Sequence, residues 1–73
     1  MKRDPRARRL AAGEITALTR LGEHCDTRRC RQPVAIVTWW WFRRHGQMRI
    51  SERFICEDHG QEFARRHHLE IEP

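Results

Sequence analysis

The feature that most constrains this chain is a set of two closely spaced pairs of metal-ligand residue types within only 73 residues. Four residues separate Cys25 from Cys30, two separate Cys56 from His59, and 25 residues lie between the two pairs. A chain this short rarely gains more than about 3–5 kcal/mol from its apolar core, so small domains usually need an additional cross-link. Charged residues make up 34% of the chain, which leaves few for a core. The paired spacing therefore predicts a domain held together by a metal ion.

The alternative is that the cysteines are buried or reactive free thiols and that the histidines lie on the surface. Three cysteines cannot all pair within one chain. No apolar run of signal-peptide length follows the basic N-terminus, so we expect a cytoplasmic protein whose thiols stay reduced. Paired ligand spacing rarely arises by chance. Metal binding is the interpretation that we favour.

Three cysteines and one histidine form a closed donor set that suits one structural zinc ion, with no open position for a substrate. Folding linked to such a site draws on about 10–16 kcal/mol of apparent binding free energy. His59 is the predicted fourth ligand because of its spacing from Cys56. The alternatives are His24, beside the first cysteine, and His67, two helical turns beyond His59.

Residue types between and after the two ligand pairs predict a β-hairpin followed by a helix. The segment 34–44 is rich in β-branched and aromatic residues, 48–55 is the return strand, and His45-Gly46 is a two-residue turn. This turn returns the second ligand pair to the first. The segment 57–68 contains good helix formers, with acidic residues in its first turn and basic residues in its last.

The N-terminal part of the chain gives weaker signals. Residues 1–9 are predicted to be a disordered basic arm. Residues 10–21 fit a short helix, which we favour, but the threonines and Gly22 also allow an extended segment. Residues 10–73 then form a single zinc-binding domain of the small α+β class.

The order of loop, hairpin and helix resembles a treble-clef zinc finger over residues 24–68. In that family the first ligand pair lies on a knuckle and the second on the first turn of the helix. The resemblance implies the same roles for the ligand residues Cys25, Cys30, Cys56 and His59. The chain is also similar to small zinc-finger proteins of actinobacteria and their phages. They share a Cys-x4-Cys followed by Pro, a hairpin, a Cys-x2-His and a pair like Phe63-Ala64.

Strand side chains alternate, so the three consecutive tryptophans cannot share one face of the hairpin. The face that we expect to form the core, next to Phe63, carries Val37, Trp39, Trp41, Met48, Ile50 and Phe54. The other face carries Ile36, Thr38, Trp40, Phe42, Arg49, Ser51, Arg53 and Ile55. This second face is either a binding surface or a second small core covered by residues 10–21.

The distribution of charge favours a polyanionic partner, and the alternative is that the basic segment is a solvated tail. Residues 1–31 contain nine Lys/Arg and four Asp/Glu, whereas residues 32–73 contain six of each, so the whole excess of +5 lies in the first part. We expect a DNA- or RNA-binding protein with contacts mainly to phosphate. The expected contact residues are Arg3, Arg6, Arg8, Arg9, Arg28, Arg29, Arg31, Arg49 and Arg53. The last helix is too acidic for insertion into a major groove.

The alternative function is a protein–protein adaptor that docks through Trp40 and Phe42 onto a larger transcription or replication assembly. An enzyme is not expected, because the chain has one serine, no glycine-rich phosphate loop, and cysteines committed to metal. We also expect no small-molecule substrate and no membrane association.

Overall fold

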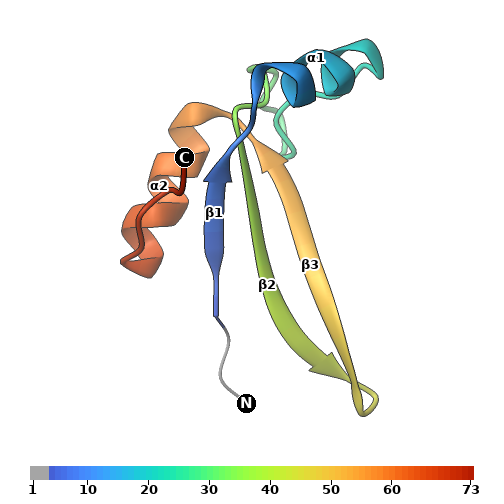
Figure 1. The fold of residues 1–73 in the computed structure, drawn as a ribbon, viewed down its shortest axis with the longest axis vertical. Coiled ribbons are helices and arrows are strands. Elements are labelled where there is room, and N and C mark those ends of the chain that lie inside the picture. Colours follow the sequence, from blue (N-terminus) through green and yellow to red (C-terminus); the bar gives the residue numbers. More distant parts are fainter. Residues whose placement is uncertain (1–3) are drawn as a thin grey trace.

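The computed structural model describes residues 4–73 and has a three-stranded antiparallel sheet and two helices, one alongside the sheet and one at its upper end (Figure 1). The elements in chain order are β1 (Arg6–Arg9), α1 (Ala12–Arg20), β2 (Ile36–Arg44), β3 (Gln47–Ile55) and α2 (Glu57–His67). The strand order is β1-β2-β3. This arrangement confirms the predicted α+β class. Within residues 4–73, neither helix has the length and apolar character needed to cross a membrane.

The β2–β3 hairpin is the longest feature of the molecule and confirms the predicted turn. Its register runs from Ile36 opposite Ile55 to Arg44 opposite Gln47, leaving His45 and Gly46 as a two-residue connection. Both turn residues have positive φ, 52° at His45 and 77° at Gly46. Such a turn matches the right-handed twist of the strands it joins. The hairpin projects well beyond α1, and the turn lies at its far end (Figure 1).

The predicted disordered arm over residues 1–9 is corrected by the structure, because residues 6–9 form strand β1. Ala7 pairs with Thr38 of β2 and is 0% exposed. On the other side of β1, Arg9 N–H donates to Glu72 O at 2.8 Å, and Glu72 N–H donates to Ala7 O at 2.9 Å. The strand forms because these backbone groups find partners on both sides. Residues 1–3 of the predicted arm lie outside the described residues.

Helix α2 packs on the face of the hairpin opposite to the one we predicted. Gly60 lies directly against Ile36, and the Phe63 ring faces Trp40. The cluster on this side is completed by Ala7 and Ile55. A single residue links β3 to α2, so the short connection and the close approach at Gly60 fix the side on which the helix lies.

Helix α1 packs at the base of the other face, which confirms the helical interpretation of residues 10–21 and rules out the alternative in which they cover Trp40 and Phe42. Ile15 and Leu18 pack on a cluster whose buried members are Leu10, Val34 and Val37. The helix begins with Glu14 accepting a hydrogen bond from Ala11 N–H at 2.9 Å. Trp40 and Phe42, on the opposite face, are therefore not covered by α1.

The contact between Gly60 and Ile36 gives a test of the packing. A Cβ on Gly60 would lie 3.0 Å from Ile36 Cβ and 3.1 Å from Ile36 Cγ1, and closer still to Cδ1. We expect Gly60→Ala to lower the free energy of unfolding by about 1–3 kcal/mol through overpacking. This loss should occur although alanine is the better helix former by about 1 kcal/mol. Urea denaturation of the metal-loaded protein measures it.

The matched control is Gly13→Ala, because Gly13 lies in α1 with no atom within 4 Å of the added Cβ. Here only helix propensity changes, and we expect stabilisation by about 0.5–1 kcal/mol. Equal effects of the two substitutions would contradict close packing of α2 on β2.

Candidate metal site

The structure brings the four predicted ligands together at the base of the hairpin. Cys25 and Cys30 come from the loop between α1 and β2, Cys56 precedes α2, and His59 lies in its first turn. Their ligand atoms all lie within 4.8 Å of one another. The order loop, hairpin and helix is what the spacing predicted. These residues can therefore bind a single metal ion.

The loop carrying the first two cysteines is fixed by its own backbone and by β3. Cys30 N–H donates to Thr27 O at 3.0 Å, and Arg29 adopts a left-handed φ of 67° that closes this turn. Cys25 N–H donates to Gln32 O at 2.9 Å. Asp26 N–H donates to Phe54 O at 2.9 Å, which ties the loop to the end of β3. We call residues 25–32 the knuckle.

Three of the distances between ligand atoms are close to those of a tetrahedral metal site. Cys25 Sγ and Cys56 Sγ lie 3.4 Å and 3.2 Å from His59 Nδ1, and Cys30 Sγ lies 3.9 Å from Cys56 Sγ. Zinc bonds of about 2.3 Å to sulfur and 2.0–2.1 Å to nitrogen place tetrahedral S···S and S···N pairs about 3.8 Å and 3.6 Å apart. Nδ1 is the His59 nitrogen that faces the sulfurs.

Burial and hydrogen bonding act in opposite directions on the thiols. Burial raises the pKa of Cys25, but hydrogen bonds from Thr27, from Cys56 N–H and with His59 lower it to about 6. Burial raises the pKa of Cys56, and the neighbouring thiols add to the increase. Its sulfur also accepts from His59 N–H at 3.5 Å, at the positive end of α2. Three adjacent thiolates repel one another, and a divalent cation would relieve that repulsion.

The two alternative histidines do not join this group. The His67 ring lies against Phe63, with ring centroids 4.4 Å apart, and His24 is exposed. Both fall outside the set of ligand atoms that the structure brings together. His59 is thus the histidine placed for coordination.

Several arginines predicted to contact nucleic acid instead pair with carboxylates. The pairs are Arg6–Glu72, Arg8–Glu14, Arg9–Glu57 and Arg53–Asp26. The Arg9 guanidinium lowers the pKa of Glu57 to about 2, mainly by hydrogen bonding. That pair joins β1 to the first turn of α2. These arginines therefore have a structural role that charge counting did not reveal.

Other arginines are exposed and lie away from carboxylates. Among residues 4–73, the predicted contacts Arg28, Arg29 and Arg31 on the knuckle have no carboxylate partner, and Arg49 bonds only to Gln47. Arg3 lies outside the described residues. Sequence reasoning missed Arg43 and Arg44, which flank the hairpin turn and are exposed. The sequence contained a signal for this basic hairpin tip, because residues 41–51 contain three arginines and no acidic residue.

The aromatic residues also differ from their expected exposure. Trp40 and Phe42, predicted to dock a partner, are half-buried. The exposed apolar side chains of the hairpin are Trp41, Met48 and Ile50, at 46%, 51% and 48%. They belong to the face that we predicted to be core, beyond the part that α1 covers.

No family model, curated protein or solved structure matches this chain. Its function must therefore be inferred from its own residues. Those that carry chemistry are the ligand cluster, the arginines without carboxylate partners and the aromatic side chains of the hairpin.

Metal removal tests the site. We expect the purified protein to hold one equivalent of metal by elemental analysis and to lose its fold, by circular dichroism, when a strong chelator removes it. Metal binding of this kind supplies about 10–16 kcal/mol of apparent free energy, so Cys56→Ser and His59→Ala should each unfold the chain or weaken metal binding strongly.

The matched controls are His24→Ala and His67→Ala, which replace the two alternative histidine ligands. Both variants should keep one metal per chain. Loss of metal from either of them, or an unchanged spectrum after chelation, would contradict the assignment.

Proposed function

We propose that this chain is a non-catalytic, zinc-binding protein that binds nucleic acid, with a treble-clef-like fold stabilised by one structural zinc ion. Thiolates and imidazole are donors that suit zinc. Four protein ligands complete a tetrahedral shell and leave no position for a substrate. The donor set thus supports a structural metal.

The observation that carries the nucleic-acid proposal is the distribution of arginines without carboxylate partners. Among residues 4–73, eight arginines have no carboxylate partner, and six of them form a knuckle group (Arg28, Arg29 and Arg31) and a tip group (Arg43, Arg44 and Arg49). The other two, Arg20 and Arg65, lie singly on the two helices, and all eight are exposed. Positive side chains that lack internal partners are available to phosphate, with which arginine forms bidentate hydrogen bonds. The arginines of β1 are paired with carboxylates, so the proposal does not depend on them.

The two groups lie at opposite ends of the hairpin (Figure 1). Strands of nine residues span about 30 Å at 3.3 Å per residue. Contacts at both ends would follow several nucleotides of backbone and would be largely independent of sequence. Helix α2 packs on the sheet, so the hairpin and knuckle would make the contacts.

Salt dependence tests this proposal. We expect the zinc-loaded protein to bind a labelled oligonucleotide at low salt in fluorescence anisotropy. The logarithm of the affinity should fall with log[salt] by about 0.9 per neutralised phosphate on duplex and about 0.7 on a single strand. Replacing the tip group by glutamine should weaken binding and make this slope shallower by about 2–3 units.

The matched control is Arg65→Gln, which removes an exposed arginine of α2. It should leave both affinity and slope close to those of the parent protein. Absence of binding at low salt by folded, zinc-loaded protein would overturn the proposal.

A second candidate, the protein–protein adaptor, is favoured by the exposed patch of Trp41, Met48 and Ile50. Contiguous exposed apolar side chains mark interaction surfaces. This patch differs from the predicted docking residues, of which Trp40 faces α2. The adaptor would be established instead by binding of a protein partner that persists after nuclease treatment. This binding should be lost in Trp41→Ala and kept in the variant with the tip group replaced by glutamine.

A further inference from the structure

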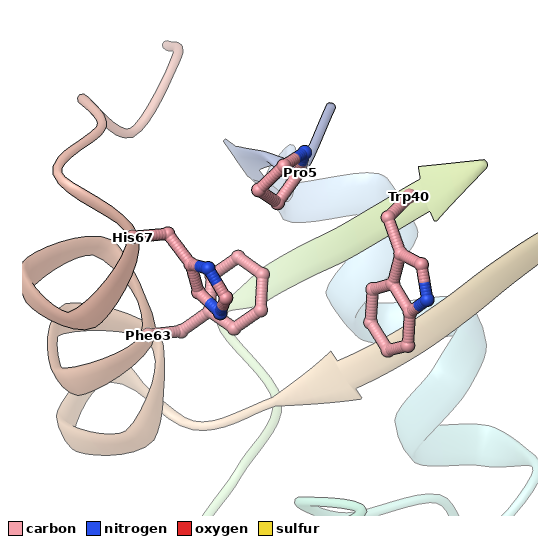
Figure 2. Close-up of a pocket in the computed structure, with 4 residues that line it drawn as sticks. All are labelled: Pro5, Trp40, Phe63 and His67. Atoms are coloured by element: carbon pink, nitrogen blue, oxygen red, sulfur yellow. The ribbon is translucent and has the colours of Figure 1, made fainter. Parts of the chain in front are cut away.

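A cavity of about 350 Å³ lies between the middle of β2 and helix α2 and is lined by Pro5, Trp40, Phe63 and His67 (Figure 2). Trp40 forms the strand side, and Phe63 and His67 form the helix side. The volume is at the lower end of the range of small-ligand sites, about 300–1,000 Å³. Neither the metal cluster nor the two arginine groups include these residues.

The rings of Trp40 and Phe63 line this cavity together. They are close to parallel, with an interplanar angle of 25°, and their centroids are 6.4 Å apart. Ring pairs with centroids about 4.5–7 Å apart are in the range of offset or tilted aromatic contacts. The two rings therefore form one aromatic lining of the cavity, which we call the slot, and a planar ring that enters the cavity can stack on it.

The Phe63 side of the cavity is supported by a second ring of α2. His67 lies one turn after Phe63, and its ring is 4.4 Å from the Phe63 ring at an angle of 45°. Residues four apart share a helix face. A ligand entering the cavity would thus meet several aromatic or imidazole rings and the proline ring of Pro5.

The charged residues near the cavity indicate which kind of flat or apolar ligand it would bind. Among the residues that the structure describes, no acidic one lines it, although a carboxylate would help to hold a bound cation. Trp40 pairs with Ser51, and the residues two positions either side of Ser51 on the same face of β3 are Arg49 and Arg53. Arg49 has no carboxylate partner among residues 4–73. The surroundings favour a planar group attached to an anion.

We infer that Trp40 and Phe63 form a slot for one unpaired nucleobase of a single-stranded nucleic acid, whose neighbouring phosphate binds Arg49. This inference rests on the proposed nucleic-acid binding and makes it more specific. A base within a duplex is already stacked and paired, so it cannot enter the slot. The protein should therefore bind a single strand more tightly than a duplex of the same length.

The test uses the full zinc-loaded chain and a ten-nucleotide oligothymidylate, with a ten-base-pair duplex for comparison. Stacking of one base corresponds to about 5- to 100-fold in affinity. We expect Trp40→Ala to lose this factor on the single strand while the salt slope stays unchanged, because no phosphate contact is removed. The loss on duplex should be small.

Trp41→Ala is the matched control, since it removes the next tryptophan, which points to the opposite face and is 46% exposed. It should leave affinity unchanged. Zinc content and circular dichroism report whether each variant is folded. If Trp40→Ala fails to fold, the double variant Trp39→Phe/Trp41→Phe leaves Trp40 as the only tryptophan, and the single strand should quench its fluorescence at saturation.

The outcomes separate the two proposals. Equal single-strand affinity of Trp40→Ala and Trp41→Ala, or no quenching of Trp40, would overturn the slot while leaving nucleic-acid binding intact. No binding to either probe at low salt would overturn both. Trp40-dependent binding of a proline-rich or methyl-lysine peptide, with none to oligothymidylate, would assign the slot to a protein partner and overturn the inference.

Discussion

The meeting of the knuckle with the start of α2, which brings four potential metal ligands together, is the constraint on which the rest of this structure depends. The buried apolar residues fall into two small clusters, one on each face of a three-stranded sheet. Neither cluster resembles the core of a larger domain, whereas a zinc site contributes free energy of folding directly. Cys25 and Cys56 are buried within one of these clusters. A metal ion bound by these residues would join the knuckle to α2 at the place where apolar side chains also pack, so binding and packing would stabilise each other.

Basic residues near the N-terminus form ion pairs within the folded chain. Arg6, Arg8 and Arg9 each meet a carboxylate, and two of these pairs link residues 48 and 66 positions apart. Exposed ion pairs contribute only about 0–1 kcal/mol each. Their value lies in neutralising a basic strand at the sheet edge, where the C-terminal tail covers the remaining backbone groups. The positive charge that remains available is shifted toward the knuckle and the hairpin tip.

Three consecutive tryptophans have three environments. Trp39 packs beside the α1 cluster, Trp40 faces α2, and Trp41 is exposed. Alternation along β2 separates Trp40 from its two neighbours. Trp39 and Trp41 share a face, and they differ because α1 reaches only the base of the hairpin. The projecting half of the hairpin thus combines exposed apolar side chains with arginines that have no carboxylate partner within the described part of the chain.

The sequence by itself determined the ligand quartet, the hairpin with its His45-Gly46 turn, and helix α2. These features follow from the spacing of ligand residues, from the residue types of the turn and from helix and strand propensity. Each of these can be read from a short segment of sequence. Only the tertiary structure decided that residues 6–9 form a strand, which face of the hairpin receives α2, and which arginines remain without carboxylates. Each of these depends on contacts between distant segments: β1 needs the edge of β2, α2 needs the space that Gly60 leaves over Ile36, and an arginine's partner is set by the folded chain.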